Sequence, residues 1–289
     1  MKLLERAVGC VEQRLVLVAP PERAIPDTFT SCDFDASSHS ELIREVQRVR
    51  GAVYLEDGAI DASQLSDGLH KTPEDEYAWH VLLFDEADDL IACGWYREHH
   101  NRVEFSRLRL RHCPLATDPD WRDKLWSAVT GDIAQAHRDG LRFAEVGGWA
   151  VAEKSRCTVT PMLLALATYS LSRICGGAIG ITTATTRHGS CDILSRLGGH
   201  PLNVRGEIVP RYYDSRYRCD MEILRFDSRM PHPRFEPFVA QLEERLAEVS
   251  VVARPYWPMM REPRRPTPLV APPPVFVPDA IDRSQAASL

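Results

Sequence analysis

Glu145-Val-Gly-Gly-Trp-Ala-Val-Ala-Glu-Lys-Ser-Arg-Cys-Thr-Val-Thr-Pro161 opens the stretch, ending at Gly177, around which the rest of the chain is organised. Residues 143–151 place mainly apolar side chains on both faces of an extended segment, which predicts a buried central strand. After a polar turn, Thr160 can cap a helix and Pro161 can occupy its first position. Apolar residues then recur at helical spacing until a glycine pair ends the helix. We therefore expect a strand, a turn and a buried helix.

The turn before the predicted helix is a candidate anion site. The free backbone N–H groups of a first helical turn and the helix dipole together favour a phosphate, and Arg156 lies just before this turn. Such a site suits an acyl carrier that bears a phosphate. The expected donor-binding residues are Trp149, Ala150, Val151, Arg156, Thr158 and Thr160.

Composition bounds the class of protein. The 289 residues are 44% hydrophobic and 26% charged, which is typical of a globular protein with a sizeable core. A net charge of −6 argues against a globally basic nucleic-acid binder, although it leaves room for a local basic patch. We expect a cytoplasmic protein, because no signal peptide or membrane-spanning apolar run is found. Eight cysteines without C-x-x-C spacing indicate reduced thiols rather than a metal site.

Alternating and helical patterns predict the elements around this centre. In chain order we expect a short helix and then a strand at 14–18, an irregular connection at 19–38, a helix at 40–50, an acidic, mobile, substrate-facing loop at 54–76, strands at 77–84 and 90–97, a helix at 120–139, a strand at 178–186, a short helix at 189–197, paired strands at 207–213 and 216–226, and a helix at 235–249. The expected organisation is an extension at 1–38, a main domain at 39–228, a helix at 229–252 and a Pro-rich tail at 253–289.

A run of arginines marks one more predicted strand, residues 102–112. Alternation would place the three odd-numbered arginines from 107 to 111 on one face, where they repel one another unless acidic groups meet them. One interpretation is a solvated strand face compensated by nearby Asp and Glu side chains. The other is a docking surface for an acidic partner, made of Arg107, Arg109, Arg111, Arg216 and Arg218.

The order of these elements resembles that of the Gcn5-related N-acyltransferase (GNAT) superfamily, from about Ser40 to Phe226. The resemblance is carried by Glu145–Leu164 and by Ile193-Leu194-Ser195-Arg196-Leu197-Gly198, which is similar to a late helix ending in Leu-Gly. Within the superfamily, the chain looks closest to acyl-homoserine-lactone synthases and long-chain N-acyl amino acid synthases. The segments that resemble theirs are Arg50-Gly51-Ala52-Val53-Tyr54, Glu145-Val146-Gly147-Gly148-Trp149-Ala150-Val151 and Gly198-Gly199-His200-Pro201-Leu202.

The resemblance implies both a fold and an activity. The fold would be α/β of the α+β kind: a GNAT-like mixed, mostly antiparallel central sheet flanked by helices, followed here by the Pro-rich tail. The activity would be transfer of an acyl group from the thioester of an acyl carrier protein or of CoA to a small-molecule amine, in specialised metabolism. No bound cofactor and no metal are expected. An acidic carrier protein would be the partner of the arginines.

Departures from the family pattern leave alternatives. The turn Arg156–Thr160 lacks the glycines that wrap a pyrophosphate, and Leu194 stands where many members have a Tyr that protonates the leaving thiolate. Gly148 stands where the lactone synthases have Arg, which puts lactone formation in doubt. A carrier-bound donor tolerates the loss of the glycines, and so does an aminoacyl-tRNA donor. A degenerate fold that binds a ligand without turnover fits the first two departures.

Glu145 is the expected general base. Burial beside Phe143 and Trp149 would raise the pKa of Glu145 toward the range of a working base, unless it forms a structural pair with an arginine. The alternative bases are His99, His100 and His80.

Two further features concern the chemistry. In the resembling fold, a backbone N–H of the central strand meets the oxyanion, and the candidates here are Ala150, Val151 and Ala152. His188 and Asp192 could form a local pair. Because no nucleophilic Ser or Cys accompanies them, a hydrolase is not indicated.

Overall fold

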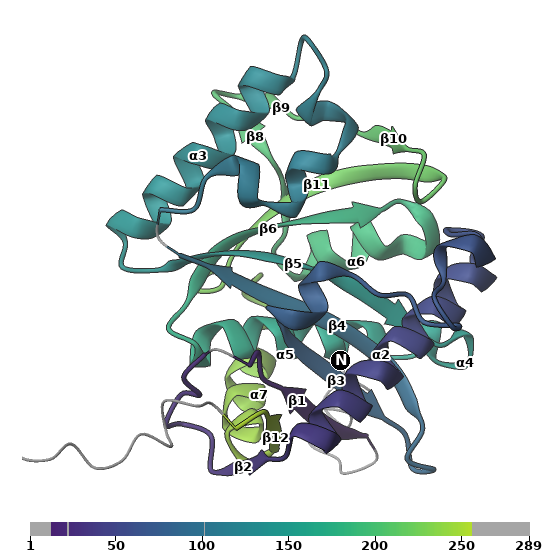
Figure 1. Cartoon of the computed structure of the whole chain (residues 1–289). Helices are drawn as coiled ribbons and strands as arrows, with labels where there is room; N and C mark the ends of the chain where they lie inside the picture. The colour runs from purple at the N-terminus through teal and green to yellow at the C-terminus, as the bar shows by residue number, and fades with distance from the viewer. Residues whose placement is uncertain (1–12, 22, 101, 256–289) are drawn as a thin grey trace, which may run out of the picture. The chain divides into compact units, whose positions relative to one another are not determined.

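The computed structural model describes residues 13–21, 23–100 and 102–255. The strands are β1 (Arg14–Val18), β2 (Ser31–Phe34), β3 (Trp79–Phe84), β4 (Leu90–His99), β5 (Arg142–Val151), β6 (Ala178–Thr185), β7 (His200–Pro201), β8 (Asn203–Val204), β9 (Glu207–Ile208), β10 (Tyr212–Asp214), β11 (Cys219–Asp227) and β12 (Ser250–Ala253). They form a ten-stranded sheet in the order β10-β11-β6-β5-β4-β3-β1-β12-β2, with β7 beside β11, and a separate β8-β9 pair (Figure 1). Neighbours run antiparallel except β5 with β6, β1 with β12 and β12 with β2.

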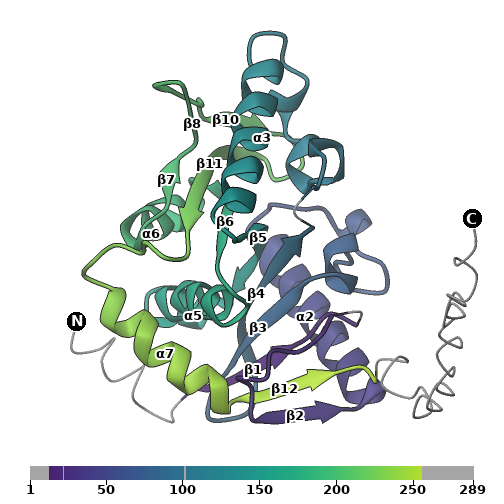
Figure 2. The same ribbon diagram turned by 90° about the vertical axis from the view of Figure 1, so that its left-hand side faces the viewer.

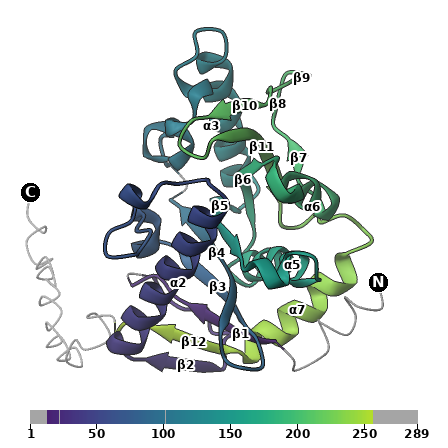
Figure 3. The same ribbon diagram turned by 90° about the vertical axis from the view of Figure 1, so that its right-hand side faces the viewer.

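Helices cover both faces of this sheet. They are α2 (Ala36–Glu56), α3 (Arg122–Arg138), α4 (Glu153–Arg156), α5 (Thr160–Ile174), α6 (Ser190–Leu197) and α7 (Glu236–Glu248). Figures 2 and 3 show α2 and α5 on opposite sides of the sheet. Leu166 of α5 and Leu242 of α7 are buried against one face, whereas Val46 of α2 and Val129 of α3 are buried against the other. The expected mixed, mostly antiparallel sheet flanked by helices is confirmed.

The predicted centre is present as β5, α4 and α5. Pro161 lies in the first turn of α5, where its fixed φ and missing N–H are tolerated. Gly176 and Gly177 follow the last turn with φ values of 98° and 83°, which only glycine adopts readily. The expected hairpin is β3 and β4, and the helices expected at 120–139, 189–197 and 235–249 are α3, α6 and α7.

The strand expected at 102–112 is wrong. The chain forms three short 3-10 turns instead: η3 (Phe105–Arg107), η4 (Arg109–His112) and η5 (Pro114–Ala116). The reason is a distant carboxylate. Glu145 accepts the backbone N–H groups of Arg109 and Leu110 at 3.0 Å each, and a strand would have used these groups in its ladder.

The segments before and after the predicted helix at 40–50 also differ from the prediction. Helix α2 begins at Ala36, because the Asp35 side chain accepts the Ser37 N–H, and it continues to Glu56. The segment expected to be a mobile loop contains the turns η1 (Ala62–Gln64) and η2 (Pro73–Glu76). It packs onto the protein through the buried carboxylates of Glu74 and Asp75.

Strands from both ends of the described chain complete the sheet. β2 lies in the expected irregular connection, and β12 lies at the boundary between the predicted last helix and tail; neither was predicted. Of the strands expected at 207–213 and 216–226, β10 pairs with β11, whereas β9 pairs with β8. The helix expected before residue 14 and the tail beyond Pro255 lie outside the described residues. No helix in the described part of the chain combines the length and apolar character needed to cross a membrane.

Candidate functional site

Two parallel strands in the middle of the sheet separate partway along their length. β5 and β6 are paired from Arg142 with Ala178 to Val146 with Thr182, and no pairing follows. On its other side β5 shifts register against β4 beside Trp95. Gly148 has a φ of +61°, and a Cβ added there would lie 2.2 Å from Trp95 Cδ1. The Trp95 ring therefore occupies the space over this glycine, and the strand can bend here only without a side chain.

Two cavities meet where the strands separate. The larger has a volume of 160 Å³ and the smaller 60 Å³. Their shared lining is Val146, Gly147, Trp149, Thr182 and Leu194. The smaller cavity is apolar, with walls that include Leu164, Tyr169, Leu224 and Phe226. The larger has a mixed lining, more polar than that of the smaller, and the arginines that line it are Arg50, Arg109, Arg156 and Arg187.

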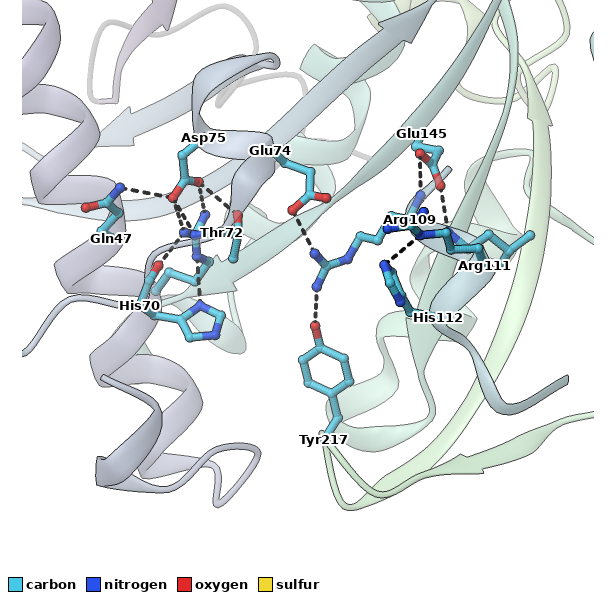
Figure 4. Close-up of polar contacts among 12 residues, drawn as sticks. Gln47, His70, Thr72, Glu74, Asp75, Arg109, Arg111, His112, Glu145 and Tyr217 are labelled. Atoms are coloured by element: carbon cyan, nitrogen blue, oxygen red, sulfur yellow. Dashed lines mark hydrogen bonds and ion pairs between the residues drawn. The ribbon is translucent and has the colours of Figure 1, made fainter. Parts of the chain in front are cut away.

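A buried ion pair supports one side of the larger cavity. Arg50 of α2 donates to both carboxylate oxygens of Asp75 at 2.8 Å, and its Nε donates to His70 Nδ1 at 3.2 Å (Figure 4). Burial and the neighbouring Arg50 charge lower the pKa of His70 to about 4, so the ring is neutral at pH 7. This neutral ring lines the cavity, while the two charges satisfy each other behind it.

Arg109 forms a second cluster in the same cavity. Its Nη1 donates to Glu74 Oε2 at 2.7 Å, and its Nη2 donates to the Tyr217 hydroxyl at 2.6 Å (Figure 4). The Tyr217 ring meets Tyr54 edge-on at 6.2 Å, and the Tyr54 hydroxyl donates to the backbone oxygen of Trp149 at 3.3 Å. The cluster therefore ties the 3-10 turns to α2 and to the bend of β5.

A third cluster lies where α2 ends. Asp57 Oδ1 forms an ion pair with Arg156 Nη1 at 2.7 Å, and the same oxygen lies 3.2 Å from His188 Nε2. The sequence had suggested a pair of His188 with Asp192. In the structure His188 pairs with Asp57 instead. His188 has a φ of +55°, which is uncommon for a residue with a side chain and is often found at functional sites.

Glu145 lies outside both cavities and differs from the expectation. It accepts a hydrogen bond from His99 Nε2 at 2.9 Å. It also accepts hydrogen bonds from two backbone N–H groups of η4 (Figure 4). Burial disfavours its charge, but these hydrogen bonds outweigh burial and lower the pKa of Glu145. The raised pKa expected for a base is therefore wrong. Glu145 lines a recess of 20 Å³, which shares Trp95, Arg109 and Tyr217 with the larger cavity.

The other expected bases also lie away from the two cavities. His99 is buried against Glu145, and His100 is exposed at the end of β4. His80 is buried, and its Nε2 lies 3.3 Å from the backbone oxygen of Asp75. Burial is the main cause that lowers the pKa of His80 to about 4.

Arg107, Arg109 and Arg111 share no strand face, so the common face that alternation predicted for these three arginines is wrong. Arg107 and Arg111 are exposed, whereas Arg109 lines the larger cavity. Arg216 is paired with Asp214 and Arg218 with Asp61. The shared face is lost because side chains in 3-10 turns do not alternate as they do in a strand. Arg109 and Arg216 nevertheless line one recess, and a docking surface for an acidic partner stays a prediction.

Some of the expected donor-binding residues line the larger cavity, and others line neither cavity. Trp149 and Val151 line the larger cavity with Arg156, and the indole Nε1 of Trp149 is buried without a hydrogen-bond partner among the described residues. The Thr160 N–H is already bound by the Thr158 hydroxyl at 3.1 Å, and neither residue lines a cavity. Among the expected oxyanion donors, Ala150 is buried, and the N–H of Ala152 is taken by the backbone oxygen of Ile91 at 2.8 Å.

Several lining residues were missed from the sequence. His70, Tyr217 and Asp57 belong to no motif, and each reaches the cavity from a turn or a helix end. Local signals in the sequence were carried by Arg109 of the arginine run, by the glycine pair, Trp149 and Val151 of β5, and by Arg156. Within residues 13–21, 23–100 and 102–255, no group of three or more His, Cys, Asp or Glu side chains is arranged to hold a metal ion.

No protein-family model matches the sequence, and a search of curated proteins finds no match. Solved acyltransferase structures do match, in agreement with the resemblance seen in the sequence. FeeM, an N-acyl amino acid synthase from uncultured soil microbes, is 14% identical at a TM-score of 0.44, over 75% of this chain and 92% of that chain. BjaI, a CoA-dependent acyl-homoserine lactone synthase solved with SAM and isopentyl-CoA, is 12% identical at a TM-score of 0.49, over 84% and 94%. TofI, solved with an inhibitor and MTA, is 13% identical at a TM-score of 0.47, over 81% and 99%. At such identities the similarity lies in the arrangement of strands and helices alone.

Proposed function

We propose that this chain is an N-acyltransferase that forms an amide from an acyl thioester and a small-molecule amine. The observation that carries the proposal is the separation of β5 and β6, beside which an apolar cavity and a larger, more polar cavity meet at Trp149. The acyl chain would occupy the smaller cavity, because its methylene groups are removed from water there. The amine and the remainder of the donor would occupy the larger cavity.

Arg156 is proposed to hold the donor. Its Nη2 atom is buried and makes no hydrogen bond with any described residue, and Glu56 Oε2 lies at 3.6 Å, beyond hydrogen-bond distance. A phosphate oxygen would supply the missing acceptor, and Arg is well suited to bind it. Both the phosphopantetheine of a carrier protein and CoA carry such a phosphate, so either thioester fits this role.

The proposed reaction joins the amine nitrogen to the thioester carbon and breaks the C–S bond, and the amine proton ends on the leaving thiol. Trp149 Nε1 would donate a hydrogen bond to the thioester oxygen as negative charge develops on it. His188, oriented by Asp57, would accept the amine proton. Glu145, His99 and His100 stay predictions as bases, and none of them lines either cavity.

Product formation tests the proposal. The purified chain is incubated with pooled primary amines and, in separate reactions, with acyl-CoA, acyl carrier protein or aminoacyl-tRNA, and amides are detected by mass spectrometry. We expect an amide from at least one of the two thioesters. Product from aminoacyl-tRNA alone would contradict the thioester donor. A stable thioester complex that never yields product would indicate a binding protein instead.

Matched variants test the residues proposed to act. Trp149→Phe and His188→Asn should each lower kcat by about 100-fold, the usual loss when one oxyanion donor or one general base is removed. Arg122→Gln is the control, because Arg122 is paired with Asp123 on the surface and lines neither cavity. Unchanged kcat in both test variants would show that other groups perform these steps.

A further inference from the structure

One residue that lines the smaller cavity carries a buried hydroxyl group without a partner among the described residues. Tyr169 lines this cavity and is 7% exposed, and its hydroxyl makes no hydrogen bond with any described residue. The hydroxyl of the neighbouring Thr168 is satisfied, since it donates to the backbone oxygen of Leu164 at 2.9 Å. Much of the remaining wall is apolar and includes Leu224 and Phe226. Tyr169 and Trp149 are therefore the two residues of this wall that carry a buried side-chain polar atom without a partner within the described chain, and the Trp149 indole is already assigned to the thioester oxygen.

The Tyr169 ring is held in place by its neighbours. It meets Phe226 edge-on, with centroids 5.8 Å apart and an interplanar angle of 62°. Phe226 in turn covers Gly180, where an added Cβ would lie 2.3 Å from the Phe226 Cζ. Because both rings are packed between α5 and the sheet, the hydroxyl cannot turn to find a partner elsewhere without disturbing this packing.

An unpaired buried hydroxyl has an energetic cost. Leaving it without a hydrogen bond costs about 1–3 kcal/mol, and a phenylalanine in the same place would avoid that cost. A trapped water molecule needs two or more polar partners, which these largely apolar walls supply poorly. A bound ligand that brings an oxygen atom to Tyr169 would satisfy the hydroxyl.

We propose that the transferred acyl group carries an oxygen, as a hydroxyl or a keto group, that forms a hydrogen bond with the Tyr169 hydroxyl. This inference rests on the proposed function, since it assigns the smaller cavity to the acyl chain. The cavity volume of 60 Å³ is well below the roughly 150 Å³ that holds a benzene-sized guest, so the acyl group is short. A donor without the oxygen binds less well, because it leaves the hydroxyl unpaired.

Isothermal titration calorimetry with N-acetylcysteamine thioesters tests this without requiring turnover. The probes are butanoyl and hexanoyl thioesters, either unsubstituted or with one hydroxyl or keto group at each position in turn. We expect at least one oxygenated probe to bind about tenfold more tightly than its unsubstituted parent. Tyr169→Phe should abolish this preference and change the affinity for the parent by less than about twofold, because only the hydroxyl is removed.

Tyr212 provides a matched control. Its hydroxyl is also buried and unpartnered within the described residues, but Tyr212 lines neither cavity. Tyr212→Phe should leave the preference for oxygenated probes intact. Equal binding of both kinds of probe by the unaltered chain, no binding of any probe, or a preference that survives Tyr169→Phe would overturn the proposal.

The same experiment separates this inference from the proposed function. Amide formation from unsubstituted thioesters, together with equal binding of both kinds of probe, would leave the transferase standing and remove the role of Tyr169. Binding that depends on Tyr169 but is never followed by amide formation would leave the oxygen site standing and remove the transfer reaction.

Discussion

Glu145 accepts hydrogen bonds from the His99 ring and from two backbone N–H groups, so its charged form is satisfied in the folded protein. Glu145→Gln replaces one accepting oxygen with an NH₂ group that faces a donor. We expect the free energy of unfolding, measured by urea titration, to fall by about 1–3 kcal/mol. In the Glu145→Gln variant, the fall of kcat/KM on the acid side of its pH profile should remain as in the unaltered chain.

The catalytic role first expected for Glu145 makes a different prediction. If Glu145 were the base, the glutamine variant would lose both kcat and the fall of kcat/KM on the acid side, and its stability would change little. Glu222→Gln is the matched control, since Glu222 is also buried and hydrogen-bonded but lines neither cavity. The two variants should lose similar stability.

His80 should make folding sensitive to mild acid. Its pKa is lowered to about 4 from an ordinary 6.5, mainly by burial and to a smaller extent by Arg50 and His39, while Asp75 opposes them. Between these two pH values the unfolded chain binds a proton at this position and the folded protein does not. Stability therefore falls as the pH drops from 6.5 toward 4, by roughly 2–3 kcal/mol from this residue.

Urea titrations at pH 7.5, 6 and 5 measure this effect. His80→Gln cannot titrate but can still donate a hydrogen bond to the backbone oxygen of Asp75, so its stability should depend less on pH than that of the unaltered chain. Identical slopes in the two proteins would show that His80 is not buried in its neutral form.

At the level of the elements, the bend of β5 depends on Gly148. Gly148→Ala must place a Cβ 2.2 Å from Trp95 Cδ1 at a φ of +61°. Gly140→Ala is the control, since Gly140 has a φ of +72° with nothing within 4 Å of the added Cβ. Both variants lose about 1–2 kcal/mol from the backbone conformation. We expect Gly148→Ala to lose more than this in urea titration, and also to lose thioester binding.

The correct prediction of β5 and α5, and the wrong prediction for residues 102–112, have a physical explanation. β5 and α5 were predictable because side-chain alternation, Pro161 and the terminal glycines act within a turn of the chain. The arginine run wrongly predicted a strand, because the backbone N–H groups of Arg109 and Leu110 donate to Glu145, up to 36 residues away. A pattern in the sequence cannot reveal that partner.

For the whole molecule, β12 is the element on which the edge of the sheet depends. It pairs with both β1 and β2, for example through Val252 with Val18 and with Asp33. A chain ending at Val249 should therefore melt at a clearly lower temperature, because β2 loses its partner. A chain ending at Pro255 keeps every described strand and should melt like the full chain. Equal melting of all three proteins would mean that β12 contributes little.

Local sequence was sufficient for the class of fold and for the centre of the sheet. Alternating apolar residues, a proline at a helix start and glycines at its end act on neighbouring residues, so the strand at 143–151, the helix after Pro161 and the hairpin could be written down beforehand. Three of the lining residues, Trp149, Val151 and Arg156, also followed from this stretch.

Contacts between distant segments decided the remainder of the site. A carboxylate becomes a structural acceptor or a catalytic base according to the groups that face it, and those groups come from elsewhere in the chain. Glu145 met the amides of η4, whereas Asp57 at the end of α2 met His188. The unpaired hydroxyl of Tyr169 also depends on contacts between distant segments. The sequence identifies Tyr169 as a core residue of a helix, and only packing between α5 and the sheet places it in the wall of the smaller cavity with its hydroxyl unpaired among the described residues.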